Sequence, residues 1–469
     1  MLTYDVDIWS IRKRSGRPKP YELRWRVGTR PHSRSFKLKP QADGRRAELM
    51  AALREREQFD EETGLPAREL AALNSPTWFE HATAYVLMKW PRAAAKHRAS
   101  IAEALAVVVP ALVTTTRGAP KPKTLRAALY QWAFRAVPGP AGDLIARHMV
   151  EEPPSEIRAA LSWISEHSMK VRALDNPGLL RPALDALARR TDGRPAAENT
   201  ARRKRMVLSN FLRYTVEEQG LLAANPLARV DWTPPETDDE IDFRYVPGPA
   251  LARALINAVQ AAGPRGAHLA AFFGCLYYAA MRPGEIASLK LADCTLPSDT
   301  DDAADEWGTL LLGESRPEVG GGWTNDGASY EARGLKRRAR GATRAVPIPP
   351  SLVRLLRDHV AAYGTAPDGR LFRAARGGRV RSTEYCAVWS AARTAVLTET
   401  ETGSPLAEVP YSLRHAGVSL WIKSGVDPAE VAARAGHSIA VLYRFYAKIL
   451  KGDQARSNTL IAAGLAAEG

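Results

Sequence analysis

The sequence predicts a multidomain, mainly α-helical protein with a small β-sheet in its N-terminal part and a mixed α+β domain in its C-terminal part. The chain has 469 residues, which is more than one ordinary domain holds. Apolar residues alternate with polar ones over residues 2–39, whereas helical periodicity dominates most of the remaining chain. We expect an N-terminal domain, a helical domain, a linker and a C-terminal domain with a small antiparallel sheet, over residues 1–73, 75–229, 230–249 and 250–469 respectively.

Composition and charge limit the class of partner. The formal net charge is +15 and the pI is about 9.8. Folding does not require such an excess, and self-repulsion opposes it, so the charge indicates a polyanion such as nucleic acid. The three cysteines are scattered and form no CxxC pair, which fits a reducing cytoplasm and argues against a zinc finger. We find no apolar signal core and no run that could cross a bilayer, and expect a cytoplasmic protein without a membrane partner.

The N-terminal domain combines three short strands with a dense set of basic residues. The strand patterns are LTYDVDIWSIRKR, YELRWRVGTR and SRSFKLK, and helix follows from Ala42 to about Leu73 with a break near Gly64. Between Arg12 and Lys39 the basic residues are opposed only by Glu22. A sheet face in a DNA groove and a solvated sheet face explain this pattern equally well. The DNA-binding candidates here are Arg12, Lys13, Arg14, Arg24 and Arg26.

The second domain reads as helical throughout, with no strand pattern. Its candidate helices are 77–89, 97–109, 122–136, 155–170, 178–190 and 197–219, separated by turns such as VPGPAG. The last helix begins with four basic residues and continues with an apolar stripe. Such a cluster is usually only exposed, but the stripe holds it in place, so we favour contacts with the DNA backbone. These candidates are Arg202, Arg203, Lys204 and Arg205.

Two prolines and an acidic cluster over 230–249 indicate the linker. In the C-terminal domain, helices are predicted over 250–262 and 268–280, followed by the turn that holds Arg282 and Glu285. TLLLGE and TRAVPIP read as strands, and SLVRLLRDHVAAYG and TEYCAVWSAARTAVL as helices. GRLFRAARGGRVRS, between those two helices, reads as a strand-like segment with a basic turn.

Residues 411–447 form three short helices with several polar groups at their ends. The first helix ends at Gly425, Asp427 caps the second, Gly436 closes it, and Ser438 can cap the third. This segmentation puts Arg414, His437 and Tyr446 near helix ends, where side chains can converge on one ligand. A guanidinium, an imidazole and a phenol together suit a phosphodiester, because they can bind its oxygens, move a proton and attack phosphorus. From the residues alone, His415 reads as a packed histidine and Tyr443 as a core aromatic.

Five landmarks over about 270–450 resemble the tyrosine recombinase (phage-type integrase) family. RPGEIASLKLADC is similar to its first arginine box, and Tyr411-Ser412-Leu413-Arg414 to its HxxR box. Ala435-Gly436-His437 follows, and Tyr446 is the ninth residue after that histidine, as in the family. TRAVPIP resembles the last strand of the family's catalytic sheet. The chain departs from the pattern at Tyr411, where the family usually has histidine.

The resemblance implies a fold and a set of roles. The domains would be an arm-type DNA-binding domain, a helical core-binding (SAM-like) domain and a mixed α+β tyrosine-recombinase catalytic domain. Tyr446 would attack DNA and form a 3′-phosphotyrosine, while Arg282 and Arg414 hold the phosphate oxygens. Glu285 would orient Arg282. Lys336 would protonate the leaving oxygen, and His437 with Tyr411 would assist proton transfer.

Lys336 belongs to a basic run with Arg337 and Arg338, which also reads as a loop that faces DNA phosphates. The resemblance further implies double-stranded attachment-site DNA as substrate, a homotetramer that exchanges strands through a Holliday junction, and nucleoid association. An excisionase or a host DNA-bending factor is a candidate partner. No metal, ATP or other cofactor is expected, since we find neither a Walker-type loop nor a convincing ligand cluster.

Three other functions share some of these features. A type IB topoisomerase also cleaves and rejoins DNA, and a non-catalytic DNA-binding regulator would keep the basic surfaces. A metal-dependent nuclease would lose its activity with a chelator. The tail after Tyr446, with apolar Leu460, Ile461 and Leu465, fits docking on a neighbouring protomer and fits a poorly ordered terminus nearly as well.

Overall fold

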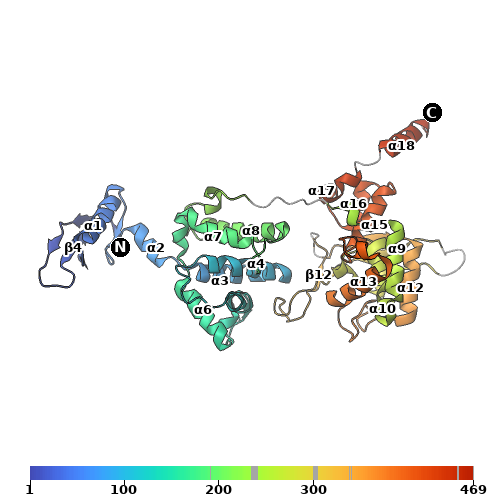
Figure 1. The fold of residues 1–469 in the computed structure, drawn as a ribbon, viewed down its shortest axis with the longest axis horizontal. Helices are drawn as coiled ribbons and strands as arrows, with labels where there is room; N and C mark the ends of the chain where they lie inside the picture. Colours follow the sequence, from blue (N-terminus) through green and yellow to red (C-terminus); the bar gives the residue numbers. More distant parts are fainter. Residues whose placement is uncertain are drawn as a thin grey trace. The chain divides into compact units, whose positions relative to one another are not determined.

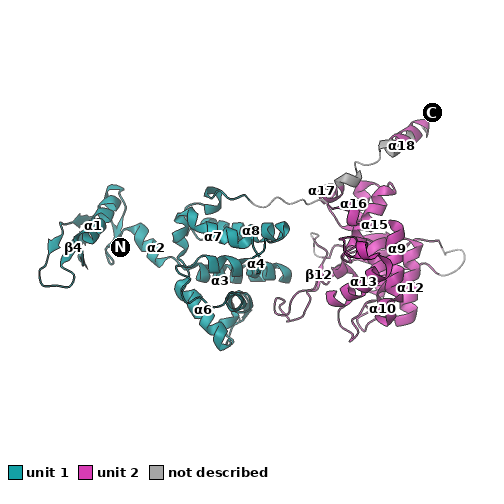
Figure 2. Cartoon of the chain, in the orientation of Figure 1, with its two compact units in different colours: residues 1–236 teal, residues 237–469 magenta. Residues whose placement is uncertain are grey.

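The computed structural model describes residues 1–190, 192–233, 241–298, 305–336, 339, 341–450 and 454–467. The chain forms two compact units, Met1–Glu236 and Thr237–Gly469 (Figure 2). Helices make up most of both units, as predicted (Figure 1). Residues 234–240 of the predicted linker lie outside the described residues, and the finer division of the chain into domains remains a prediction.

The N-terminal sheet has the predicted three-stranded layout. β4 (Tyr21–Val27) is central, β5 (Arg30–Phe36) pairs with one edge, and β2 (Val6–Ile8) and β3 (Arg12–Lys13) share the other edge. The predicted first strand is therefore interrupted between β2 and β3. α1 (Lys39–Arg54) covers one face, where its Leu49 packs with the apolar side chains of β4.

The predicted break near Gly64 in the helical segment 42–73 is confirmed, and it is wider than expected because a short strand pair occupies it. β6 (Phe59–Asp60) pairs with β1 (Leu2–Thr3), and α2 (Ala67–Asn74) follows. The reversal between them passes through Gly64, whose φ of +73° favours glycine.

The six predicted helices of the second region are confirmed, with somewhat different bounds. They are α3 (Trp78–Lys89), α4 (Ala95–Val108), α5 (Pro122–Ala128), α6 (Ser155–His167), α7 (Arg181–Leu187) and α8 (Glu198–Arg213). Single π-helical turns extend α5 over Leu129–Ala133 and α8 over Tyr214–Glu218. Short 3₁₀ helices cover Trp90–Arg92, Val109–Ala111, Arg147–Met149, Val171–Asp175, Pro177–Leu180 and Pro226–Arg229.

The expectation that this region lacks strands is wrong. β7 (Ala136–Pro138) and β8 (Leu144–Ala146) form an antiparallel hairpin. The prolines and glycines of VPGPAG are the turn of this hairpin and not only a break between helices. Three-residue strands leave too little alternation for a period of two to be seen in the sequence.

The C-terminal unit has an antiparallel sheet of order β13-β10-β9, made by Arg344–Ile348, Gly308–Leu312 and Cys294–Thr295. A separate pair joins β11 (Glu314–Ser315) to β12 (Arg333–Gly334). The helices are α9 (Pro249–Ala261), α10 (Gly263–Tyr278), α11 (Pro283–Ile286), α12 (Pro350–Tyr363), α13 (Ser382–Val396), α14 (Glu399–Thr402), α15 (Ser412–Lys423), α16 (Pro428–Ala435), α17 (Ile439–Leu450) and α18 (Gln454–Ala467). Phe243–Tyr245 and Leu291–Asp293 are 3₁₀ turns.

The segment 369–382, which the structure describes in full, forms no strand, so that prediction is wrong. It makes only an isolated bridge, from Arg370 to Lys290. Leu371 and Phe372 are adjacent and both buried, whereas a strand would turn one of them away from the core. Core packing and not sheet pairing buries this apolar pair.

α10 packs against α9, α12, α13 and α15. Its Phe273 stacks on Trp389 of α13, with ring centroids 5.3 Å apart. α15 lies close against α10 at Gly417, where any Cβ would collide with the Tyr277 carbonyl oxygen. This approach brings the start of α15 beside the residues that follow α10. In the described parts of the chain, no helix is both long and apolar enough to traverse a bilayer.

Candidate active site

The site begins at the end of α10, where the backbone turns sharply. Ala280 is buried and has a φ of +44°, a conformation that costs a residue with a side chain about 1 kcal/mol or more. The turn frees the Ala280 carbonyl and places Arg282 as the N-cap residue of α11. A strained residue at this point is compatible with a functional role.

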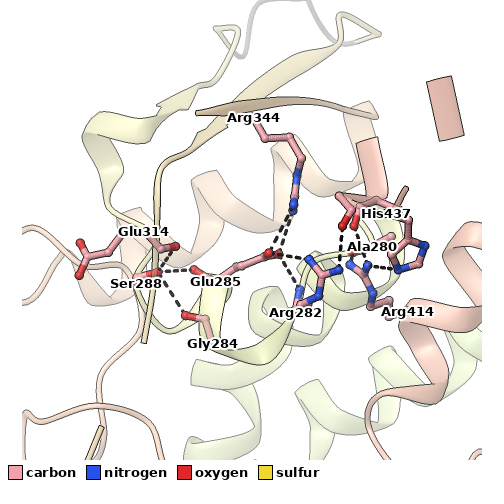
Figure 3. A network of polar contacts seen from close by, with 11 residues as sticks. Ala280, Arg282, Gly284, Glu285, Ser288, Glu314, Arg344, Arg414 and His437 are labelled. Atoms are coloured by element: carbon pink, nitrogen blue, oxygen red, sulfur yellow. Dashed lines mark hydrogen bonds and ion pairs between the residues drawn. The ribbon is translucent and has the colours of Figure 1, made fainter. Parts of the chain in front are cut away.

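Glu285 holds two arginines together (Figure 3). Its carboxylate accepts hydrogen bonds from the backbone N–H and Nη1 of Arg282, each 2.9 Å long, and from Nη2 of Arg344 at 2.8 Å. Both Glu285 and Arg344 are buried. Burial alone would raise the pKa of Glu285, but the positive charges of Arg344, Arg414 and Arg282 lower it to about 2. The carboxylate therefore stays ionised at any ordinary pH.

The turn after α16 carries the second part of the site. Gly436 ends α16 in the left-handed conformation, with φ +62° and ψ +42°, which was predicted from its position as a C-cap. Its carbonyl oxygen accepts a 2.9 Å hydrogen bond from Nη2 of Arg282. A Cβ at this residue would overlap Nη1 of Arg344. Glycine is thus required for both the backbone angle and the space.

Arg414, on the first turn of α15, is 1% exposed. Its guanidinium donates to the carbonyl oxygens of Ala280 and Ala435, the second at 2.6 Å. Its Nη2 also donates to Nε2 of His437 at 2.8 Å. Arg414 thereby ties the turn after α10 to the turn after α16 and brings the two arginine boxes into one cluster (Figure 3).

His437 has one nitrogen engaged and one without a partner. Since Arg414 can only donate, Nε2 of His437 accepts, and the neutral ring carries its hydrogen on Nδ1. Burial, then the charges of Arg414 and Arg282, lower the pKa of His437 to about 3, so the ring is neutral. Nδ1 is buried and finds no hydrogen-bond partner among the described residues. A buried donor of this kind indicates a missing acceptor.

Tyr446 lies where α17 kinks, with φ −121° and ψ +15°, and is 1% exposed. Its hydroxyl is 2.9 Å from Nδ1 of His415. Its ring is 6.3 Å from the ring of His437 and 6.0 Å from that of Phe243, measured between centroids. Burial raises the pKa of Tyr446, so the phenol is protonated in the structure as it stands.

These groups surround a pocket of about 650 Å³ in the C-terminal unit. The pocket is lined by Arg282, Lys336, Tyr411, His415, Gly436, His437, Ser438, Val441, Arg444, Phe445 and Tyr446. Arg414 does not line it and lies behind His437. Among the described residues, the buried cluster contains the guanidiniums of Arg344 and Arg414 but a single carboxylate, that of Glu285. An excess of buried positive charge favours an anion at this position.

The structure brings together those predicted site residues of the C-terminal unit that it describes. Arg282, Lys336, Tyr411, His437 and Tyr446 line the pocket, and Arg414 and Glu285 stand directly behind it. Arg337 and Arg338 lie outside the described residues. The interpretation of Tyr443 as a core aromatic is wrong, because α17 turns it outward and it is 50% exposed.

The basic residues of the N-terminal sheet are only partly unopposed. Arg26 forms ion pairs with Asp5 and Asp7, at 3.2 and 2.5 Å, and Arg14 pairs with Glu22 at 2.8 Å. Asp5 and Asp7 precede the basic segment in sequence, but β2 pairs with β4 and puts Asp7 opposite Arg26. Arg24 is exposed and lies over the Trp9 ring, and Arg12 and Lys13 of β3 are exposed as well.

The four basic residues at the start of α8 do not share one surface. Arg202 and Arg203 are exposed, and Lys204 is 8% exposed. Arg203 and Lys204 both lie 3.5 Å from the carboxylate of Glu103. The guanidinium of Arg205 lies over the ring of Trp232. Four consecutive residues point to different sides of a helix, so the four basic groups do not form one exposed surface. Lys204 is therefore an internal ion-pair residue of this unit.

Sequence reasoning missed the contacts of His415 and Arg344. His415 reads as a packed histidine, but it bonds the hydroxyl of the predicted nucleophile. Arg344 could have been found from its strand, since Val346 and Ile348 share its face and are both fully buried. An arginine on a buried face requires a carboxylate partner. The signal for His415 is weaker, because it depends on how α15 meets α17.

We find no group of three or more His, Cys, Asp or Glu residues that could hold a metal ion within the part of the chain that the structure describes.

Comparisons with known proteins add structural likeness only. No family model matches the chain, and no curated protein matches its sequence. Among solved structures, the chain matches a Tn1549 transposon integrase in complex with circular intermediate DNA, with a TM-score of 0.47 and 15% identity over 67% of this chain and 96% of that one. In structure, the chain is similar to integrases and site-specific recombinases.

Two further matches are of the same kind. The XerH site-specific recombinase bound to a palindromic difH substrate matches with a TM-score of 0.42 and 12% identity, over 82% of this chain and 95% of that one. The lambda integrase bound to DNA matches with a TM-score of 0.37 and 13% identity, over 63% of this chain and 91% of that one.

Proposed function

We propose that the chain is a tyrosine recombinase that cleaves and rejoins DNA through a 3′-phosphotyrosine at Tyr446. One observation carries the proposal. Tyr446 lines one pocket with Arg282 and His437, whose buried Nδ1 has no hydrogen-bond partner among the described residues, while the buried charge of Arg414 lies behind. A tyrosine buried only for packing would not need cations on this side.

The pocket residues divide the chemistry of a phosphodiester transfer. The phenol oxygen of Tyr446 attacks phosphorus as the bond from phosphorus to the 5′ oxygen breaks. Arg282 and Nδ1–H of His437 donate to the non-bridging oxygens, where negative charge develops. The departing 5′ oxygen takes a proton from Lys336, which lines the same pocket. Rejoining is the reverse sequence, so no nucleotide cofactor is consumed.

Arg414 would act from behind the pocket wall in this arrangement. It holds the acceptor nitrogen of His437 and thereby fixes the ring with its donor Nδ1 free of that bond. The charge of Arg414 would also attract a bound phosphate on the other side of the His437 ring. Glu285 would keep Arg282 and Arg344 at a fixed distance from each other.

The basic surfaces outside the pocket support DNA as the substrate. Exposed Arg24, Arg12 and Lys13 on the N-terminal sheet, and exposed Arg202 and Arg203 on α8, would contact phosphates in the backbone. We propose a homotetramer on attachment-site DNA, with strand exchange through a Holliday junction. The exposed Ile461 and Leu465 of α18 are apolar enough to contact a neighbouring protomer.

The test pairs two tyrosines that are three residues apart on α17. The full chain is incubated with nicked duplex DNA that carries the attachment site, mapped from the ends of the DNA element that encodes it. We expect a denaturant-resistant protein–DNA adduct from the wild type and from Tyr443→Phe, in which the changed residue is exposed. Tyr446→Phe should form none.

Three results would contradict the proposal. The wild type could give no adduct, Tyr446→Phe could still give one, or the activity could vanish with a chelator. The last result would indicate a metal-dependent nuclease, and DNA binding without an adduct would indicate a regulator.

A further inference from the structure

The partner of the Tyr446 hydroxyl is His415. Nδ1 of His415 lies 2.9 Å from that hydroxyl, and the two rings are 6.1 Å apart between centroids and tilted by 46°. The family resemblance places histidine at position 411, but this chain has Tyr411 there. The ring of Tyr411 meets the ring of His415 edge-on at 5.1 Å. Tyr411, which stands where the family has its histidine, therefore packs against the ring of another histidine, His415.

The protonation states of this pair are those that proton transfer requires. Burial raises the pKa of Tyr446, so its hydroxyl keeps a proton that it can donate. Burial, followed by the charge of Arg414, lowers the pKa of His415 to about 4, so its ring is neutral. In the tautomer that carries the ring hydrogen on Nε2, Nδ1 of His415 accepts a hydrogen bond from the Tyr446 hydroxyl. In this tautomer the nucleophile points its proton at an imidazole lone pair.

Other described residues that line the pocket are poor acceptors for this proton. His437 presents an N–H at Nδ1, since its Nε2 accepts from Arg414. Arg282, Lys336 and Arg444 are cations at neutral pH. Tyr411 offers a neutral hydroxyl, which is a much weaker base than imidazole.

We propose that His415 is the general base of strand cleavage in this chain, a role that rests on the proposed function of Tyr446. As the phenol oxygen bonds to phosphorus, its proton passes to Nδ1 of His415 and the bond from phosphorus to the 5′ oxygen breaks. The 5′ oxygen takes its proton from Lys336. In rejoining, His415 returns the proton to the phenol oxygen.

The pocket links this transfer to the presence of DNA. An imidazolium at His415 would lie beside the buried charge of Arg414, which disfavours it in the empty pocket. A phosphodiester in the pocket brings negative charge close to the same ring and offsets this repulsion. The phenol therefore keeps its proton until a phosphate is bound.

The first part of the test removes the base but keeps its shape. In His415→Asn, the side-chain oxygen takes approximately the place of Nδ1 and can still accept from Tyr446. General-base catalysis typically contributes 10²–10⁴-fold, and we expect a loss of roughly this size in the single-turnover rate of adduct formation. Binding of the nicked duplex and thermal unfolding of the full chain should both stay close to the wild type. His415→Gln is the second variant if the asparagine disturbs folding.

The second part separates proton transfer from positioning. Tyr446 is replaced by a difluorotyrosine, whose phenol is more acidic and needs less help to lose its proton. We expect this residue to restore most of the rate lost in His415→Asn while changing the wild-type rate much less. A histidine that only positions Tyr446 would leave the asparagine variant equally slow with either phenol.

Each outcome has one meaning. Rates of the His415 variants within a few-fold of the wild type overturn the inference, and so does a slow variant that the acidic phenol fails to restore. Absence of any adduct with the wild-type chain refutes the function proposed for Tyr446 itself. The two failures are therefore distinguishable in one set of reactions.

Discussion

Arginine–carboxylate pairs occur in two contrasting places in this chain. On the N-terminal sheet, Arg26 is 36% exposed, and its partners Asp5 and Asp7 are 59% and 55% exposed. Behind the pocket of the C-terminal unit, Arg344 and Glu285 are 3% and 1% exposed. An exposed pair of this kind stabilises the fold only weakly. When a buried pair loses one member, the remaining charge has neither solvent nor a partner.

The difference also separates two ways in which the proposed recombinase would contact DNA. The cations of the sheet are exposed or locally neutralised and would contact phosphates from outside. The cations in and behind the pocket are fixed by Glu285, Gly436 and Ala435 and would hold a single phosphate. Only the second arrangement is organised before the ligand arrives, which transition-state stabilisation requires.

The largest effect is expected when the buried carboxylate is neutralised. Glu285→Gln leaves the buried guanidinium of Arg344 and that of Arg282 without a negative partner, and we expect the C-terminal unit to lose about 3–5 kcal/mol of unfolding free energy. Hydrogen exchange of peptides from α10 and α15 measures this loss within the full chain. Asp7→Asn is the matched control on the sheet, and we expect less than about 1 kcal/mol there. Equal losses of unfolding free energy in the two variants would contradict the contrast between the buried pair and the exposed pair.

Two glycines give a sharper version of the comparison. Gly436 and Gly16 both have positive φ, at +62° and +80°, so alanine strains the backbone at each by about 1 kcal/mol. A Cβ at Gly16 meets nothing within 4 Å, whereas at Gly436 it meets the Arg344 guanidinium. Gly436→Ala should therefore be the more destabilising by urea unfolding, and it should slow adduct formation. A cost no greater than that of Gly16→Ala would show that the buried cluster adapts easily.

Acid should destabilise the C-terminal unit before Glu285 takes up a proton. Burial lowers the pKa of His268 and His415 to about 4 and that of His437 to about 3, from 6.5. The unfolded chain therefore binds these protons first, and stability is full above pH 6.5 and falls towards pH 4. The slope is at most about 1.4 kcal/mol per pH unit for each histidine. Urea unfolding at several pH values measures the slope, which His268→Gln should reduce. An unchanged stability from pH 7 to 4.5 would contradict this.

The smallest effects are expected on the sheet surface. Arg26 is held by two aspartates, whereas Arg24 lies over Trp9, so Arg24→Ala should weaken DNA binding more than Arg26→Ala. For each lost phosphate contact, the negative slope of log binding constant against log salt concentration becomes shallower by about 0.9. Binding titrations at several salt concentrations compare the two variants. A larger change for Arg26→Ala would mean that DNA displaces the aspartates.

Local signals predicted the helical frame of the site well. Asp427 caps α16 through its side chain, and Gly436 ends that helix in the left-handed conformation. Ser438 accepts from the Val441 N–H, as expected of a cap. Such signals involve residues within four positions of one another, and can be read without knowledge of the fold.

Contacts between distant segments could not be predicted in the same way. The bond from His415 to Tyr446 depends on how α15 packs against α17, and the pairing of Arg26 with Asp7 depends on strand register. Lys204 was placed on a DNA-facing cluster because its neighbours are basic, yet its position on α8 turns it towards Glu103. In each case the partner depends on how distant segments pack, which the order of residues does not state.

The central claim is that the phenol oxygen of Tyr446 attacks a phosphodiester held in this pocket. The direct measurement is mass spectrometry of the adduct after nuclease and protease digestion. The account predicts a nucleotide phosphate on Tyr446, within the peptide that follows His437. A nucleotide on Tyr443, on Tyr411 or on a residue outside the pocket would contradict it.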